Sequence, residues 1–546
     1  MLAEAEYKSP LDYRDLLFNY TTANQAVAQV QQWLAPAERE YRERQVHREQ
    51  VGGATRLRTE LRDFYVEIGE YLAENEGEAL QHYYVETTAY QEALAGTRTV
   101  FVGRKGTGKT ANLIALSNEL KSSRNNTVCV LQPVGYEIES LVRLFGLYQE
   151  RDTKGYVVES LWKFLLLTEI ANAAAIEIEE RPLWLPRNDS EKRLLELLGA
   201  EASVMLGDFS VRLERCVSSL LHSARSPSVE QERKGISEAL HETLLKDLRA
   251  VLGDVLSAKD RVAILIDNLD KAWARQADIA RLAEFLFGLF SATNRLLIDL
   301  ARNDSRRKPI KCTAAIFVRS DIFGKVLDVA QEPDKLAFTR LAWNDRQVLA
   351  RVVEMRFFAA HREAGEGRQL WARYFGSEIR GMEPKEYILS RILPRPRDLV
   401  YLVKGAISMA VNRGHERVEA EDVLKAEYEY SRYAMDSVMV ENSITLPQLE
   451  AVLYEFVGSP AVILEEGVLA AITRAGIPQA KHADVAGHLV GINFLGLETR
   501  KGKFSYLDEP RELKKLTVLS DKLAKRKGAR RYQIHPAFRK YLEIAE

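Results

Sequence analysis

Hydrophobic residues in the middle of this 546-residue chain fall into short runs that are separated by stretches with helical periodicity. The first run, Val-Phe-Val at residues 100–102, is β-branched and aromatic and predicts a buried strand. Four more runs predict strands at residues 127–131, 261–266, 312–318 and, with a weaker pattern, 337–341. Because helical stretches lie between the runs, the pattern favours an α/β fold with a parallel sheet covered by helices on both faces.

The spacing of these runs predicts a large insertion in the α/β core. About 130 residues of helical periodicity separate the second run from the third, far more than the dozen or so that a plain crossover requires. We therefore expect a helical insertion at about 134–258 within a core of residues 96–345.

The regions on either side of the core are also expected to be helical. Helical patterns predict an N-terminal region over residues 1–95 and a lid over residues 346–440. Residues 441–546 mix short helices with strand-like pieces at 491–495, 504–507 and 532–535. That mixture suits a small α+β module of winged-helix type.

A glycine-rich loop directly follows the first predicted strand. Residues 103–110 read Gly-Arg-Lys-Gly-Thr-Gly-Lys-Thr, and residues 111–120 read as a helix. Strand, loop and helix in this order are the context of a phosphate-binding P-loop, whose glycines let backbone N–H groups converge on phosphate oxygens. Lys109 would reach the β- and γ-phosphates of ATP, and the Thr110 hydroxyl would bind Mg²⁺. The predicted nucleotide-binding residues are Gly103, Lys105, Gly106, Thr107, Gly108, Lys109, Thr110 and Ala111.

A carboxylate for the same metal ion is predicted at the end of the third strand. Residues 264–270 read Ile-Leu-Ile-Asp-Asn-Leu-Asp, which is the Walker B pattern of an apolar strand ending in acids. Asp267 would hold Mg²⁺ together with Thr110, although an acid at a strand end can also simply cap the next helix. Asn268 follows Asp267 and cannot accept a proton, so Asp270 is the candidate general base. If Asp270 is not catalytic, hydrolysis should be slow and the protein should work as a switch.

Arginines at two other positions are candidates to contact the phosphates. Arg319 ends the fourth predicted strand, where a polar residue can sense the γ-phosphate; the alternative is an ion pair with Asp321 or Asp267. Arg397, and with less support Arg395, lies in a Pro-Arg-Pro-Arg-Asp segment that opens a helix. Guanidinium groups match phosphate geometry, but proline and aspartate at such a place are also ordinary helix-start residues.

Two further clusters have structural alternatives. Arginines before the fourth strand could reach a nucleotide on a neighbouring subunit, or could form a solvated basic turn: Arg302, Arg306 and Arg307. Tyrosines before the P-loop could include one that stacks on adenine, or could pack the N-terminal helices onto the core: Tyr65, Tyr71, Tyr83, Tyr84 and Tyr90.

Composition excludes several classes of function. Lys plus Arg number 77 against 78 Asp plus Glu, so a net charge of -1 gives no general attraction to nucleic acid or membranes. Three widely spaced cysteines form neither a disulfide framework nor a metal-ligand pattern. The N-terminus lacks a signal-peptide pattern, and the most apolar long window, residues 282–301, carries three charged residues. A cytoplasmic protein without a membrane span is expected.

These motifs together resemble the STAND class of P-loop ATPases, which adjoins the AAA+ superfamily and the origin-recognition ATPases. The resemblance rests on the 103–110 loop, the Asp-Asn-Leu-Asp segment, Arg319 and the Pro-Arg-Pro-Arg-Asp helix start. It implies a five-stranded sheet of order 5-1-4-3-2, a helical lid, and homo-oligomerisation controlled by ATP. Many STAND proteins are intracellular sensors, and several bacterial ones act in anti-phage defence. This chain departs from the class in Asn268, where Asp is commoner, and in having no tandem repeats after the lid.

Two functions therefore compete. The first is a slowly hydrolysing ATP switch in bacterial defence or stress signalling, with any effector residing on a separate protein. The second is a DNA-binding ATPase that resembles origin-recognition or transposition ATPases, because residues 511–540 hold eleven Lys or Arg and two acids. The densest basic segment begins at Lys522, ends at Arg531, and would form a wing or loop. A small-molecule kinase is disfavoured because no acceptor-site motif is present.

Overall fold

The computed structural model describes most of the chain beyond residue 52. The described residues are 53–133, 144, 146, 151–182, 184–223, 242–269, 279–302, 308–330, 332–361, 367–442, 446, 448–507 and 512–545. Contacts divide the chain into residues 1–63 and a second unit, Phe64–Glu546, which holds both sheets and the candidate site. Predictions for residues 1–52, Asp270, Arg306 and Arg307 lie outside the described residues.

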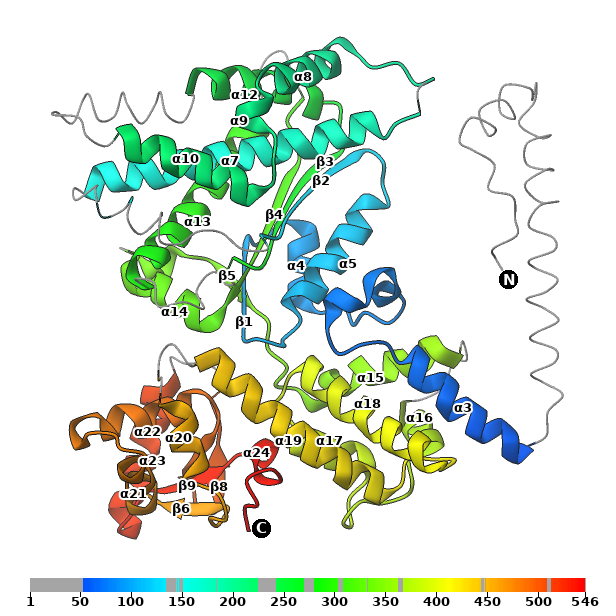
Figure 1. Cartoon of the computed structure of the whole chain (residues 1–546), viewed down its shortest axis with the longest axis vertical. Helices are drawn as coiled ribbons and strands as arrows, with labels where there is room; N and C mark the ends of the chain where they lie inside the picture. The colour runs from blue at the N-terminus through cyan, green and yellow to red at the C-terminus, as the bar shows by residue number, and fades with distance from the viewer. Residues whose placement is uncertain are drawn as a thin grey trace. The chain divides into compact units, whose positions relative to one another are not determined.

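A five-stranded parallel sheet forms the centre of the second unit (Figure 1). Its strands are β1 (Val100–Gly103), β2 (Asn126–Leu131), β3 (Arg261–Ile266), β4 (Cys312–Arg319) and β5 (Phe338–Arg340). Their order is β2-β3-β4-β1-β5, and every neighbouring pair is parallel. This order confirms the predicted 5-1-4-3-2 arrangement. The register places Gly103 of β1 beside Arg319 of β4, so the P-loop and that arginine start from the same edge.

Alternating side chains of the strands enter two separate hydrophobic layers, because successive strand residues point to opposite faces. Phe101, Val128 and Phe317 pack with α4 (Thr88–Ala95) and α5 (Lys109–Lys121). On the opposite face, residues such as Val102, Ile264 and Ile316 join a larger core with α7 (Arg151–Glu179), α13 (Ile279–Ala301) and α14 (Ser320–Val329). Helices therefore cover both faces, as the apolar runs predicted (Figure 1).

The described part of the insertion is helical. It comprises α7 (Arg151–Glu179), α8 (Asp189–Ala200), α9 (Ala202–Met205), α10 (Phe209–Ser223) and α12 (Glu242–Leu256). After β3 comes α13 (Ile279–Ala301), which packs along α7. The ring of Trp162 in α7 stacks on Phe285 in α13, with 4.5 Å between the ring centroids. The next elements are α14 (Ser320–Val329) and η4 (Pro333–Lys335). Among the described helices, none has the length and hydropathy needed to cross a membrane.

Further helices precede the sheet and follow it. Those before it include α3 (Gly53–Glu67), which spans the boundary of the two units, and η1 (Ala73–Asn75) and η2 (Gly77–His82) of the second unit. Those after it include α15 (Arg346–His361), α16 (Gly367–Tyr374), α17 (Pro384–Arg391), α18 (Pro396–Arg413) and α19 (Ala420–Asn442), here called the lid helices. Pro396 occupies the first turn of α18, where its missing N–H costs nothing, and Gly414 ends the helix with φ 71°.

The C-terminal residues form a second, antiparallel sheet. Its strands are β6 (Val462–Leu464), β7 (Leu495–Arg500), β8 (Lys503–Ser505) and β9 (Arg531–Ile534), in the order β6-β9-β7-β8. The helices are α20 (Leu449–Tyr454), α21 (Glu465–Arg474), η5 (Gln479–Lys481), α22 (His482–Gly491), α23 (Leu513–Lys527) and α24 (Pro536–Arg539). We call residues 448–545 the C-terminal module; its winged-helix character stays a prediction.

Two expectations about this module are corrected. The strand predicted at 491–495 starts only at Leu495, because residue 491 still belongs to α22. The basic segment predicted as a wing or loop is instead the second half of α23, followed by Gly528 with φ 90° and then by β9. Lys, Arg, Leu and Ala are strong helix formers, so this segment favours a helix over a loop despite its dense positive charge.

Candidate nucleotide-binding site

The glycines of the P-loop adopt backbone conformations that other residues avoid. Gly106 and Gly108 have φ of 83° and 90°, in the left-handed region. Gly103 has a different reason to be glycine, since a Cβ there would lie 2.3 Å from Thr107 Oγ1. Thr107 Oγ1 donates to the Arg104 carbonyl at 2.8 Å, and Trp343 Nε1 donates to the Thr107 carbonyl at 3.0 Å. The loop is therefore held in shape from within and from the residues after β5.

Lys109 and Thr110 begin α5 and direct their side chains toward the loop and the sheet. Lys109 Nζ donates to the carbonyls of Gly103 at 3.3 Å and Arg104 at 3.1 Å. Thr110 Oγ1 donates to Asp267 Oδ2 at 2.7 Å. The N-terminus of α5 adds a dipole that favours anions at the same place.

Asp267 lies at the carboxyl end of β3 and is 1% exposed. Its backbone N–H donates to the Leu131 carbonyl at 3.0 Å, which continues the pairing of β3 with β2. Asn268 has φ 65°, a conformation that asparagine tolerates better than most residues. The contact between Thr110 and Asp267 brings together two oxygen groups of the kind that Mg²⁺ binds. Both predicted metal-binding side chains therefore meet.

A cavity of about 570 Å³ opens beside these groups. Most of the predicted residues line it: Lys105, Gly106, Gly108, Lys109, Thr110, Ala111, Asp267, Arg319 and Arg397. Gly103 and Thr107 do not line it and instead support the loop. Apolar side chains also line the cavity, Leu72, Leu80, Val352 and Val400 among them. A lining that is partly polar and partly apolar suits a ligand with phosphates and a base.

Three of the five tyrosines singled out in the sequence line this cavity: Tyr71, Tyr83 and Tyr84. The Tyr83 hydroxyl donates to Glu76, and the guanidinium of Arg356 lies over the Tyr83 ring at 4.4 Å from its centroid. The Tyr84 hydroxyl is buried without a hydrogen-bond partner among the described residues, and burial raises its pKa. Tyr65 and Tyr90 are not lining residues.

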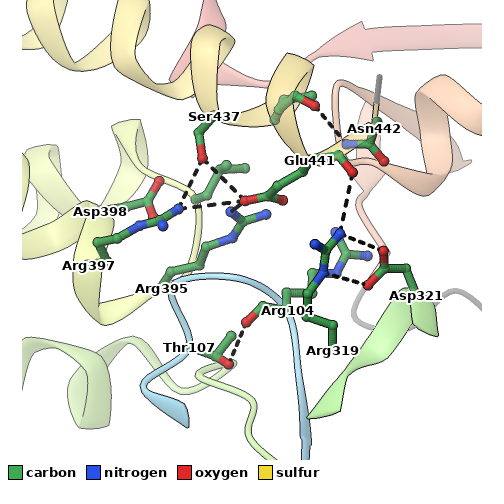
Figure 2. A network of polar contacts seen from close by, with 12 residues as sticks. Arg104, Thr107, Arg319, Asp321, Arg395, Arg397, Asp398, Ser437, Glu441 and Asn442 are labelled. Carbon is green, nitrogen blue, oxygen red and sulfur yellow. Dashed lines mark hydrogen bonds and ion pairs between the residues drawn. The ribbon is translucent and has the colours of Figure 1, made fainter. Parts of the chain in front are cut away.

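Arg319 lies beside the cavity but is engaged by a neighbour. Its Nε and Nη2 donate to the two carboxylate oxygens of Asp321 at 3.1 and 2.7 Å. This is one of the two ion pairs that the sequence left open. Nη2 also donates to the backbone carbonyl of Glu441 at 3.4 Å (Figure 2).

The arginines at the start of α18 point toward the loop from the lid helices. The backbone N–H of Arg397 donates to the Gly106 carbonyl at 3.4 Å, and a Cβ on Gly106 would lie 2.9 Å from Arg397 Nε. Arg397 Nη2 donates to Ser437 Oγ at 3.0 Å. Arg395 is 4% exposed and donates to Glu441 Oε1 at 3.4 Å. Both arginines are therefore placed near the phosphate loop, with Arg397 lining the cavity.

Glu441 was missed by the sequence reading. It sits in the last turn of α19, where a negative charge meets the negative end of the helix dipole. An acid in that position is a weak sign that nearby cations compensate its charge.

Arg302 agrees with the alternative of a solvated basic residue. Its side chain is 73% exposed and lies 3.6 Å from Asp299.

Comparisons by sequence identify two similarities. Residues 347–439, which contain the lid helices, match a family described as the FunZ-associated C-terminal helical domain. A protein of Escherichia coli (strain K12), named "Putative transposon gamma-delta 80.3 kDa protein", is 23% identical over 400 residues. That match covers 71% of this chain and 53% of the relative, so the chain spans about half of the relative's length.

Comparisons with solved structures return origin-recognition proteins. The Aeropyrum pernix ORC2 protein in its ADPNP-ADP complexes is 12% identical, with a TM-score of 0.36, over 82% of this chain and 94% of that one. The Aeropyrum pernix ORC1 protein in complex with DNA is 13% identical, with a TM-score of 0.29, over 85% and 91% of the two chains.

Proposed function

We propose that this protein binds ATP with Mg²⁺ and hydrolyses it slowly, as a nucleotide-controlled switch. One observation carries the proposal: the Thr110 hydroxyl meets the buried Asp267 carboxylate directly beneath a glycine loop that also holds Lys109. The two side chains come from segments 157 residues apart, so the contact is not a local accident of sequence. The parallel sheet supports it too, since α/β sheets bind ligands at the carboxyl ends of their strands.

Each group has a role that follows from its chemistry. Lys109 and the backbone N–H groups of residues 106–110 would bind the β- and γ-phosphates, and Thr110 and Asp267 would hold Mg²⁺. The metal ion would neutralise negative charge on the phosphate oxygens. Apolar and aromatic side chains that line the cavity, such as Leu72 and Tyr84, would contact the base. Arg319 and Arg397 reach the cavity from the core and from the lid helices, so a phosphate bound there would link the two.

The proposal also includes slow hydrolysis and a role as a switch. Asn268 lines the cavity directly after Asp267, and an amide is no general base, which leaves Asp270 as the candidate for activating water. A slow ATPase suits control of self-association, as in the STAND class, and a place in bacterial defence or stress signalling with a separate effector protein.

The variant Lys109→Ala tests nucleotide binding directly. Loss of a charge-assisted contact to phosphate should weaken ATP binding about 10- to 100-fold, measured by isothermal titration calorimetry with a non-hydrolysable ATP analogue and Mg²⁺. Lys121→Ala is the matched control, because Lys121 is exposed at the far end of the same helix. Wild-type affinity in Lys109→Ala, or no binding by the wild-type protein, would reject the proposal.

A second function, DNA binding, is supported by the exposed face of α23. Five cations are exposed there: Lys514, Lys515, Lys522, Lys525 and Arg526. Arg530 and Arg531, by contrast, form ion pairs within the module, with Asp521 and Glu465 and with Glu498. The name of the Escherichia coli relative refers to a transposon, which agrees with a DNA-related role for this chain.

A triple substitution to alanine at Lys522, Lys525 and Arg526 tests this role with a fluorescently labelled duplex. Removing three phosphate contacts should weaken binding at about 50 mM salt and reduce the slope of log affinity against log salt by about 2 to 3. Replacing Lys121, Lys192 and Lys425 removes the same charge from other exposed sites and should leave the slope unchanged. Equal losses in the two triple variants would point to net charge instead of a DNA site on α23.

A further inference from the structure

Two arginines at the start of α18 contact one carboxylate at the end of α19, and an arginine of the core contacts the backbone beside it. Glu441 Oε1 lies 3.4 Å from Arg395 Nη1 and 3.6 Å from Arg397 Nη2, and Ser437 Oγ donates to it at 3.2 Å. The backbone carbonyl of Glu441 accepts from Arg319 Nη2. The Glu441 side chain is only 11% exposed (Figure 2). It is thus a largely buried anion surrounded by positive charge.

The charge state of this carboxylate follows from its neighbours. Burial alone would raise the pKa of Glu441, but Arg395, Arg397 and Lys105, with Arg319 contributing less, outweigh burial and lower it. Burial lowers the pKa of Lys105, and Glu441 is the group that opposes this. At neutral pH Glu441 is therefore ionised, and it offsets repulsion among cations that would otherwise be buried together.

Glu441 lies where a nucleotide's phosphates would need the same cations. It lines the cavity together with Lys105, Arg319 and Arg397, and Lys109 and Thr110 line the same cavity. A carboxylate and a phosphoryl group offer guanidinium the same kind of acceptor oxygens. Two anions cannot share these cations at full strength, because they repel each other in a poorly solvated site.

We propose that Glu441 is an internal competitor for the phosphate site, so that binding of the nucleotide and release of the end of α19 are coupled. The inference rests on the proposed function and adds the regulation of that site. With nucleotide bound, phosphate oxygens replace the Glu441 carboxylate on Arg397, which lines the cavity. With the site free of nucleotide, Glu441 holds the C-terminal end of α19 against the P-loop.

The C-terminal module is connected to the same place by a second contact. Arg104, the second residue of the P-loop, donates through Nη2 to the carbonyls of Gly491 and Leu507, both at 3.2 Å. Asn493 fixes the backbone at Leu507 by donating to its carbonyl and accepting from its N–H, both at 2.8 Å. Because α19 is the last lid helix before this module, exchange of Glu441 for phosphate changes the link between the lid helices and the module.

The isosteric variant Glu441→Gln tests the competition. It removes the charge and keeps the shape, so the affinity for a non-hydrolysable ATP analogue should increase about tenfold, as is typical of coupling between sites. Inorganic tripolyphosphate should also bind more tightly, whereas adenosine should not, because only phosphate competes with the carboxylate. Glu450→Gln, which removes an exposed acid from α20, should change none of these affinities.

Hydrogen exchange distinguishes this competition from a purely structural role of Glu441, because a structural role would not make amide exchange in α19 depend on nucleotide. In the wild-type protein, the ATP analogue should accelerate amide exchange in the last two turns of α19; in Glu441→Gln, exchange there should already be fast without nucleotide. Unchanged or weaker binding in Glu441→Gln, while the wild-type protein binds the analogue, overturns this inference alone. Failure of the wild-type protein to bind any nucleotide overturns the proposed function and this inference with it.

Discussion

A single buried polar residue can hold an element in place, and His535 in the C-terminal module is the clearest case outside the candidate nucleotide-binding site. Its Nδ1 accepts from the Ala537 N–H at 3.1 Å and so caps α24, while Tyr506 contacts the ring edge-on at 4.4 Å between centroids. An acceptor nitrogen must be unprotonated. Burial, with smaller contributions from Arg539 and Arg395, lowers the pKa of His535 to about 3.

This histidine predicts acid sensitivity. The unfolded chain takes up a proton near pH 6.5 and the folded chain only near pH 3, so the unfolded state binds more protons between these values. The free energy of unfolding should therefore fall as pH drops below about 6.5, by up to about 1.4 kcal/mol per pH unit from this group. Chemical denaturation at pH 7 and pH 5 measures the loss.

His535→Asn provides the comparison, because asparagine can still cap the helix but does not titrate. The variant should lose less stability than the wild-type protein between pH 7 and pH 5. His82→Asn, at an exposed position, should behave like the wild-type protein. Equal losses for His535→Asn and the wild-type protein would show that His535 does not cause the acid sensitivity.

At the level of elements, the sequence predicted the strands and the loop whose structure is set by a local pattern of residues. The five strand predictions agree with β1 to β5 to within one residue at each end. The runs of β1 to β4 are largely buried in a parallel sheet, whereas β5, the edge strand with the weaker pattern, is more exposed. The P-loop was recognisable because strand, glycines and helix are consecutive. β6 was missed: its three residues, Val462–Leu464, are too few for a pattern. The strand at 491–495 was wrong because the end of α22 is as apolar as a strand.

Other features of the site depend on contacts between distant residues and could not be predicted. Glu441 is 46 residues from Arg395 and 122 from Arg319 in sequence, and no local pattern brings them together. The pairing of Arg319 with Asp321 was one of two alternatives, which only geometry decides. Asp270 stays a prediction. The unpartnered hydroxyl of Tyr84 also follows from packing, because nothing distinguishes this tyrosine from its neighbours in the sequence.

At the scale of the whole molecule, these local contacts make a prediction about assembly. Arg397 binds the P-loop through its backbone, Arg104 binds the C-terminal module, and Glu441 joins the end of α19 to both arginines of α18. A γ-phosphate would compete with the last of these contacts most strongly, because it adds negative charge that ADP lacks. We therefore expect surfaces of the lid helices and the C-terminal module to become available for self-association in the ATP state.

Multi-angle light scattering of the full chain measures this effect. At equal protein concentration, the mass should be larger with Mg²⁺ and a non-hydrolysable ATP analogue than with ADP. Lys109→Ala should give the same mass under both conditions, because the variant lacks the ammonium group that would bind the phosphates. Glu441→Gln should associate at lower concentrations of the analogue, because the competing carboxylate is gone. Identical wild-type masses with the ATP analogue and with ADP would contradict control of assembly by nucleotide but not nucleotide binding itself, because calorimetry measures binding separately.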